Sequence, residues 1–315
     1  MKNPDTPSLS ASNVGLPIFN VMNDQASTLR KKFSNAIQDE SPIEQKMVRS
    51  LSISSGKGGV GKTNIVVNLA IHLAKMGKKV FLIDADLGLA NIDIMLNLAP
   101  EYTIEDVLAG TKNINDIIIE GPLGIHILPA SSGISEMQSL SAEQQMSMLT
   151  ELSSLKTRYD YILIDTGAGI SSNVLRFNAA VDEVCVVTNT EPTSITDAYA
   201  LMKIMSSKYQ VSNFNLIVNE SSLQEAKSVY MRLVKVLNKF LTVNLELIGF
   251  IPRDLNFVRA VRQQTPLSLL SPNSPTTKAF ANLARQIELN PGQSIEDEDK
   301  ETFWKRLGSW KRNNK

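Results

Sequence analysis

The sequence predicts an α/β fold with a doubly wound, mainly parallel sheet of about seven to eight strands and helices on both faces. Two observations carry this prediction. Short apolar runs recur from residue 49 onward, and most of them are too uniformly apolar to have a solvated face. Segments of helical length and period separate most of these runs, and this alternation predicts right-handed crossovers between parallel strands.

Each predicted strand is a short run of aliphatic and aromatic residues. In chain order, the predicted strands are SLSISS (50–55), KVFLIDAD (79–86), GIHILPA (124–130), YDYILIDT (159–166), EVCVVTN (183–189), FNLIVNE (214–220) and LIGFIP (247–252). The clearest helix is NIVVNLAIHLAKMG, which opens after a glycine-rich turn and has Gly77 as its predicted C-cap.

Composition restricts the class of protein. The 315 residues include 32 Lys+Arg and 32 Asp+Glu, so the formal net charge is zero, whereas a protein that coats nucleic acid usually has a basic excess. The single cysteine, Cys185, lies in an apolar run and is expected to be a buried strand residue, which excludes a cluster of cysteine ligands within one chain. Neither a signal-peptide pattern nor a long apolar run is present, so we expect a cytoplasmic protein.

The composition also divides the chain into four parts. Residues 1–46 read as a flexible arm rich in Pro, Ser and Asn, with a short helix over about 24–37. Residues 47–289 form the predicted globular domain. An acidic linker (290–300) then leads to a basic tail (301–315).

A phosphate-binding loop is predicted at SGKGGVGKT, residues 55–63, between the first strand and the first helix. It fits G-x-x-x-x-G-K-[ST] in the context that this pattern requires. Glycines let backbone N–H groups turn toward phosphate oxygens, and the helix N-terminus adds positive potential. The expected nucleotide-binding residues are Gly56, Lys57, Gly58, Gly59, Val60, Gly61, Lys62, Thr63 and Asn64. The alternative is a glycine-rich turn without a ligand.

Acidic residues end two of the predicted strands. Asp84 and Asp86 follow the second strand, and Asp165 ends the strand in YILIDTGAGI. Because the carboxyl ends of parallel strands meet at one edge of a sheet, these carboxylates are expected beside the phosphates, where they can hold a metal-bound water and the attacking water. The alternative for an aspartate in this position is a helix cap or a turn.

Together these motifs resemble the MinD/ParA-type deviant-Walker ATPases, whose loop reads K-G-G-x-G-K-[ST]. The resemblance covers about residues 48–289 and implies ATP and Mg²⁺ as cofactors, with slow hydrolysis that times a monomer–dimer cycle. It implies that Lys57 reaches the phosphates of the partner subunit in an ATP-bound homodimer and that Asp86 positions the attacking water. The implied metal residues are Thr63, Asp84 and Asp165, and the implied base or ribose contacts are Asn219, Pro252, Arg253 and Asp254.

The arm resembles one branch of that family. NDQASTLRKKF, residues 23–33, is similar to the D-Q-A-x-x-L-R element of FlhG/FleN proteins, the MinD-like regulators of flagellar number; its matching positions include Asp24, Gln25, Leu29 and Arg30. The resemblance implies that the arm binds FlhF, a signal-recognition-type GTPase, and stimulates its GTP hydrolysis. Further candidate partners are flagellar switch or C-ring proteins and a transcription regulator. The alternative is an ordinary surface helix.

The tail, ETFWKRLGSWKRNNK, contains both tryptophans of the chain. On a helix, Phe303, Leu307 and Trp310 share one face, Trp304 flanks them, and basic residues lie beside that face. This pattern predicts an interfacial helix that binds anionic lipid, like the C-terminal anchor of MinD-type relatives. The alternative is a final helix packed on the core of the protein itself.

Two functions follow. The first is an ATP-switched regulator of flagellar number that acts reversibly at the inner face of the cell membrane, for example at a pole. The second is a partition-type, ParA-like ATPase that binds DNA non-specifically or positions another polar cargo. Iron–sulfur carriers and nitrogenase reductases of the same family are disfavoured, because their bridging clusters need cysteine ligands.

Overall fold

The computed structural model describes residues 48–86, 91–129, 150–152, 155, 158–290 and 303–309. The chain divides into the units Met1–Gln45 and Lys46–Lys315, and every described residue belongs to the second. The predicted arm helix, with Asp24, Gln25, Leu29 and Arg30, therefore lies outside the described residues.

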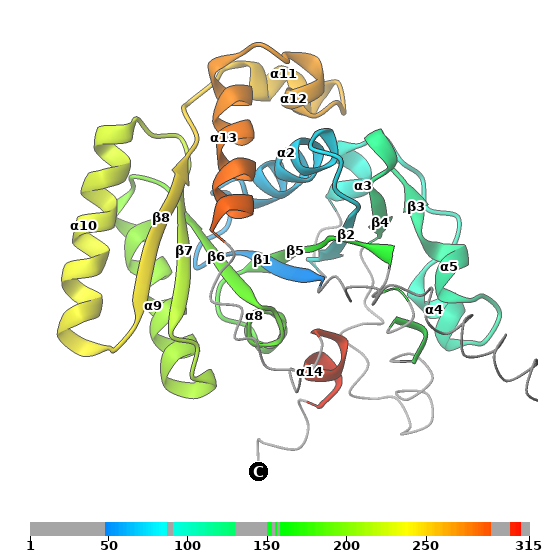
Figure 1. Ribbon diagram of the computed structural model, residues 1–315, viewed down its shortest axis with the longest axis horizontal. Helices are drawn as coiled ribbons and strands as arrows, with labels where there is room; N and C mark the ends of the chain where they lie inside the picture. Colours follow the sequence, from blue (N-terminus) through cyan, green and yellow to red (C-terminus); the bar gives the residue numbers. More distant parts are fainter. Residues whose placement is uncertain are drawn as a thin grey trace, which may run out of the picture. The chain divides into compact units, whose positions relative to one another are not determined.

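The described residues form an eight-stranded sheet in the order β3-β4-β2-β5-β1-β6-β7-β8 (Figure 1). Every neighbouring pair is parallel except β3 and β4. The predicted doubly wound, mainly parallel sheet is thereby confirmed. The strands are β1 (Arg49–Ser55), β2 (Val80–Ala85), β3 (Ile119–Glu120), β4 (His126–Leu128), β5 (Tyr161–Ala168), β6 (Glu183–Thr188), β7 (Asn213–Val218) and β8 (Asn244–Phe250).

Helices cover both faces of this sheet. The α-helices are α2 (Lys62–Lys75), α3 (Ile92–Met95), α4 (Ile104–Leu108), α5 (Ile114–Ile117), α8 (Ser172–Ala180), α9 (Pro192–Tyr209), α10 (Leu223–Phe240), α11 (Asn256–Arg262), α12 (Leu267–Leu270), α13 (Pro275–Leu289) and α14 (Phe303–Ser309), and a 3₁₀ turn, η1, spans Pro122–Gly124. In Figure 1, α2 and α13 lie on one face, whereas α8 and α14 lie on the other.

The strands are buried from both sides because successive side chains point to opposite faces. In β6, Cys185 and Val187 pack with α2 and α13, whereas Val184 and Val186 pack with α8, α9 and α10. This double burial explains why the strands read as continuous apolar runs. It also confirms that Cys185 is buried.

Helix α2 begins and ends at glycines with positive φ. Gly61 precedes it with φ 89°, and Gly77 follows it with φ 80°, values that residues with a Cβ rarely adopt. The C-cap is Met76, so Gly77 lies one residue beyond the position predicted for it, where it ends the helix in a left-handed conformation. Gly61 turns the chain from the phosphate loop into the helix.

Two strands differ from the sequence expectation. β8 begins at Asn244, before the predicted apolar run, because it is an edge strand and its exposed Asn244 and Glu246 interrupt the apolar pattern. β3 has only two residues, too few for a periodic signal. Among the described helices, none has both the length and the apolar character needed to cross a membrane.

Candidate nucleotide-binding site

The predicted site residues gather at the carboxyl ends of three adjacent strands, β2, β5 and β1. The loop from β1 to α2 carries Lys62. On the neighbouring strands, Asp84 and Asp165 are in register with each other, and Ile53 of β1 is in register with Asp165 on its other side. Residues that are far apart in the sequence thus meet because the parallel strands end at one edge.

Lys62 points back into the loop and is 7% exposed. Its ammonium group donates to the hydroxyl of Ser55 over 3.0 Å, and that hydroxyl donates to the carbonyl oxygen of Lys57 over 2.7 Å. Burial lowers the pKa of Lys62, and the carboxylates of Asp165 and Asp86 oppose this shift. The lysine is therefore a desolvated cation inside a curved backbone, as expected for a residue that neutralises phosphate.

Two loop glycines are required by close neighbours. A Cβ on Gly56 would lie 2.1 Å from the backbone carbonyl oxygen of Asp197 in α9. A Cβ on Gly61 would lie 2.4 Å from the side-chain nitrogen of Asn219, and that nitrogen donates to the carbonyl oxygen of Val60 over 2.8 Å. The loop is thus held between α9 on one side and the end of β7 on the other.

Asp165 is a buried carboxylate of the site without a hydrogen-bond partner among the described residues. It is 1% exposed, and neither carboxylate oxygen has a hydrogen-bond partner among the described residues. Burial raises the pKa of Asp165 to about 7, while the nearby Thr63 hydroxyl and Lys62 ammonium partly oppose this shift. A buried carboxylate without a partner, next to a hydroxyl and a phosphate loop, fits a site that takes up a hydrated divalent cation.

Asp84 has a different environment from its neighbour Asp165. Its carboxylate accepts hydrogen bonds from the backbone N–H groups of Asp86, Asn91 and Ile92 at 3.1–3.2 Å. Burial nevertheless raises the pKa of Asp84 to about 6. Asp84 therefore holds the backbone that follows β2 through these hydrogen bonds. Its role as a metal residue stays a prediction.

Asp86 follows β2 on the side of the Asp165 strand. A Cβ on Gly167, just after Asp165, would lie 3.4 Å from a carboxylate oxygen of Asp86. The carboxylate of Asp86 therefore lies beside the end of β5, although a Cβ at Gly167 would make only ordinary van der Waals contact with it. This position suits a residue that orients water at the phosphate loop, a role that remains a prediction.

The lysine that distinguishes the deviant loop, Lys57, turns away from the loop. Its ammonium group forms an ion pair with Glu191 at 2.6 Å and donates to the Thr193 hydroxyl over 3.0 Å. The hydrogen bond from Lys57 lowers the pKa of Glu191. The sequence carried no signal for Glu191 or Thr193, because nothing in their local pattern marks residues that meet a loop 134 positions away.

Comparison with known proteins agrees with this geometry. A family model described as an AAA domain matches residues 48–218. The antiactivator FleN of Pseudomonas aeruginosa is 40% identical over 245 residues, which cover 78% of this chain and 88% of FleN. The chain belongs to the MinD/ParA-type ATPase family.

Two further relatives show how far the similarity extends. The flagellum site-determining protein YlxH of Helicobacter pylori is 34% identical over 291 residues, covering 91% of this chain and 98% of YlxH. The septum site-determining protein MinD of Pyrococcus horikoshii, solved in complex with Mg-ADP, is similar in structure with a TM-score of 0.62 at 27% identity, covering 78% of this chain and 98% of that chain. The ATP-binding, FlhG/FleN-like character expected from the sequence is therefore confirmed.

The residues expected to contact the base make local contacts within the protein. Asn219 is buried and engaged by the phosphate loop. Arg253 is exposed and pairs with Glu220 at 3.3 Å, which joins the segments after β7 and β8. Asp254 accepts hydrogen bonds from Asn256, and Pro252 is partly exposed. Contact of these residues with adenine or ribose stays a prediction.

The tail differs from the expectation of a lipid-facing helix. Phe303 and Leu307, predicted to share one face, and Trp304, predicted beside them, are only 4%, 0% and 1% exposed in α14. They pack into the core beneath α8, because that site offers apolar contacts that a free helix would lack. In this conformation the three side chains are unavailable to lipid. Trp310 lies outside the described residues.

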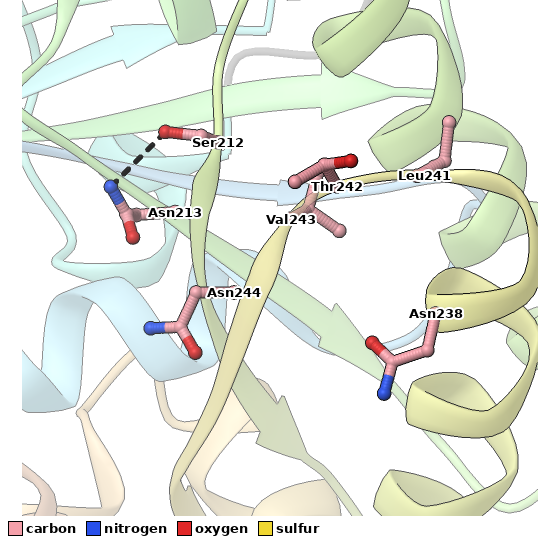
Figure 2. A pocket seen from close by; sticks show the side chains of 7 residues that line it. All are labelled: Ser212, Asn213, Asn238, Leu241, Thr242, Val243 and Asn244. Atoms are coloured by element: carbon pink, nitrogen blue, oxygen red, sulfur yellow. Dashed lines mark hydrogen bonds between the residues drawn. The ribbon is translucent and has the colours of Figure 1, made fainter.

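A shallow hollow lies at the other end of the sheet. Figure 2 shows its lining: Ser212, Asn213, Asn238, Leu241, Thr242, Val243 and Asn244. These residues precede or begin β7 and β8, so the hollow is at the amino ends of these parallel strands, whereas the phosphate loop is at a carboxyl end of the sheet. It is separate from the nucleotide site, and its lining has no titratable side chain.

Proposed function

We propose that this protein is an ATP-dependent dimerising switch that regulates flagellar number and placement. The observation that carries the proposal is the meeting of Lys62, Asp86 and Asp165 at one sheet edge in a chain that is similar to FleN and YlxH. The protein would act in the cytoplasm and reversibly at the inner face of the cell membrane. Hydrolysis would be slow and Mg²⁺-dependent, because its role is to time a cycle.

The nucleotide-handling residues divide the task. The loop backbone from Gly56 to Gly61 would cradle the phosphates, and Lys62 would neutralise them. Thr63 and Asp165 would hold Mg²⁺, which when bound offsets charge on the phosphate oxygens. Asp86 would orient the attacking water from the end of β2.

Dimerisation would depend on Lys57. In the single chain, Lys57 is bound to Glu191 and Thr193. In the homodimer it would leave these residues and reach the phosphates of the partner subunit. The dimer would therefore form only when the site contains a nucleotide with enough negative charge to attract this lysine.

The arm would provide the output toward a GTPase. Asp24, Gln25, Leu29 and Arg30 would form a short docking face for a FlhF-like GTPase, with Gln25 or Arg30 reaching its nucleotide. The arm and the membrane-binding tail are separate segments of the chain. ATP could therefore bring the arm to the membrane through the tail, without changing the arm itself.

The tail would provide membrane attachment. α14 would leave the core in the ATP-bound dimer and place Phe303, Trp304, Leu307 and Trp310 in the headgroup region of an anionic membrane. One such short helix binds weakly, but two on one dimer bind with higher avidity. Membrane residence would then follow the nucleotide state.

One observation favours a second candidate, the partition-type ATPase. The exposed side of α10 carries Lys227, Arg232, Lys235 and Lys239. A cationic stripe of this kind can bind the phosphates of DNA without sequence preference. ATP-dependent retention on DNA that falls steeply with salt would support this candidate.

The deciding experiment is sedimentation with vesicles of phosphatidylcholine and phosphatidylglycerol. We expect the full chain to sediment only with ATP and anionic lipid, and less at high salt. A chain that ends at Lys300 is the control and should stay in the supernatant. Equal sedimentation of the shortened chain would contradict the role of the tail, and retention on DNA but not on vesicles would favour the partition function.

A further inference from the structure

The docked tail helix is held by polar contacts as well as by apolar packing. Arg306 donates to the carbonyl oxygen of Ala180 over 2.6 Å and to a carboxylate oxygen of Asp182 over 2.7 Å. From the other side, Arg176 of α8 donates to the carbonyl oxygen of Leu307 over 3.2 Å and 2.8 Å. Both arginines therefore join α14 to α8 and to the residues that follow it.

The site that holds α14 also contains buried polar groups whose lack of partners disfavours docking. Arg176 is 5% exposed, has no carboxylate hydrogen-bonded to it, and its Nη1 has no partner among the described residues. The indole N–H of Trp304 is likewise buried without a described partner. Buried polar groups without partners are destabilising, and both would be hydrated if α14 left. These two groups therefore oppose the apolar packing of α14.

Helix α8 also contacts the strands that form the nucleotide site. Asn178 of α8 accepts a hydrogen bond from the Ser54 hydroxyl over 2.7 Å, and that hydroxyl lies 2.5 Å from the hydroxyl of Thr166. Ser54 precedes Ser55, which binds Lys62, and Thr166 follows Asp165. A movement of either strand end would therefore be transmitted to α8 through buried hydrogen bonds.

We propose that α8 connects the nucleotide site to the tail and that Asp182, with Arg176, latches α14 in the docked state. This inference rests on the proposed function, because it assigns a regulator to the tail. The latch acts after nucleotide binding: a change at the strand ends moves α8, and the contacts of Arg176, Ala180 and Asp182 with α14 weaken together.

Asp182 offers a selective way to open the latch. One of its carboxylate oxygens accepts from Arg306, and the other accepts from the backbone N–H and the hydroxyl of Ser50 at 3.0 Å and 2.6 Å. In Asp182→Asn, the amide oxygen can keep both bonds to Ser50, whereas its NH₂ group faces the guanidinium of Arg306 and cannot accept from it. The substitution removes the Asp182 contact of the latch and leaves the Arg176 contact, the tail sequence and the start of β1 unchanged.

Tryptophan fluorescence reports the latch directly, because the chain has only two tryptophans and both lie in the tail. In a Trp310→Phe background, emission comes from Trp304 alone. Without nucleotide, we expect weak acrylamide quenching, because Trp304 is 1% exposed. Asp182→Asn should raise the ratio of released to docked tail about tenfold, which corresponds to about 1.4 kcal/mol. ATP should raise quenching in the background protein in the same direction.

Two further variants test whether the latch acts after nucleotide binding. Lys62→Ala should move the response to ATP to concentrations about tenfold to a hundredfold higher. Lys62→Ala with Asp182→Asn should show high quenching without nucleotide but only weak sedimentation with phosphatidylglycerol vesicles, because a single tail helix binds weakly. Glu120→Gln, on exposed β3, is the control for the loss of one negative charge and should behave like the background. If Asp182→Asn leaves Trp304 as protected as before, the latch is wrong. If quenching rises in Asp182→Asn but that variant does not sediment with vesicles in the presence of ATP, the latch stands and the membrane function is wrong.

Discussion

The ammonium group of Lys57 lies 2.6 Å from the carboxylate of Glu191, at the start of α9 and outside the phosphate loop to which Lys57 belongs. The other loop lysine, Lys62, is buried inside the loop. The two lysines of one nine-residue motif therefore have opposite environments. Lys62 is already buried in the loop of its own chain, whereas Lys57 would have to leave its ion pair with Glu191 before it could act in a second chain, as proposed.

This contrast predicts separate effects for Lys57. Lys57→Ala should keep ATP binding to the single chain, because the side chain points away from the loop interior, but should weaken ATP-dependent dimerisation at least tenfold. Glu191 loses only a partly exposed ion pair, so the fold should be almost unaffected. Analytical ultracentrifugation with a non-hydrolysable ATP analogue measures the dimer. A dimer as tight as that of the unmodified protein would contradict the exchange.

Lys62→Ala should weaken ATP binding by about tenfold to a hundredfold, because hydrogen bonds from a desolvated ammonium to phosphate are among the stronger polar contacts. Isothermal titration calorimetry measures this loss. Lys57→Ala is the matched control, since it removes the same charge from the same loop. Similar affinity in the two variants would contradict the distinct roles.

Asp86→Ala should bind ATP but hydrolyse it at least about a hundredfold more slowly, because water near the phosphate loses its orienting carboxylate. The variant should persist as a dimer on size-exclusion chromatography with ATP and Mg²⁺. If it elutes as a monomer under these conditions, the nucleotide-bridged dimer is wrong for this chain.

His72 predicts a pH dependence of folding. It is 8% exposed in α2, and its Nε2 lies 3.1 Å from the hydroxyl of Ser268 in α12. Burial lowers the pKa of His72 from 6.5 to about 4, with Lys75 and Arg285 adding to the shift. The unfolded chain therefore binds the proton first, so the contribution is complete above pH 6.5 and is lost as the pH falls toward 4.

His72→Gln should flatten that part of the stability curve, because glutamine can still bond to Ser268 but does not titrate. The difference between the two proteins across this window should be up to roughly 3 kcal/mol. Urea unfolding at a series of pH values measures it. Parallel curves for the two proteins would exclude His72 as a source of acid sensitivity.

Gln25→Ala should leave ATP hydrolysis and dimerisation unchanged and reduce stimulation of a FlhF-like GTPase by about tenfold or more. The reason is that Gln25 belongs to the arm and would act on the nucleotide of another protein. Arg30→Ala tested beside it separates the two candidate side chains. Undiminished stimulation by the Gln25 variant would remove that residue from the mechanism.

The parts of this protein that were predictable share a local cause. The strands, α2 and the phosphate loop are recognisable because apolar runs, glycines and Lys62 are adjacent in the sequence. The grouping of Asp84, Asp86 and Asp165 followed from the rule that parallel strands end at one edge. The face of α14 was also correct, since Phe303 and Leu307 are spaced for a helix.

What could not be predicted depends on distant contacts. The spacing of Phe303 and Leu307 is the same for a helix on lipid and for a helix on the core of the protein, because both environments are apolar. The site beneath α8 exists only after the sheet has formed. Likewise, Asn219 was expected at the base, but its bond to Val60 arises from where β7 ends beside the loop.

Strand β1 joins the arm to the phosphate loop, and its first residues are firmly attached. Arg49 pairs with Glu183 and donates to the carbonyl oxygen of Ile287, while Ser50 is bound by Asp182. A force applied to the arm would first act on these contacts of Arg49 and Ser50. It would have to break them before it could displace the phosphate loop at the other end of β1. If the arm recruits a partner protein as proposed, it would act as a tether: a force on the arm would leave the contacts of the phosphate loop unchanged.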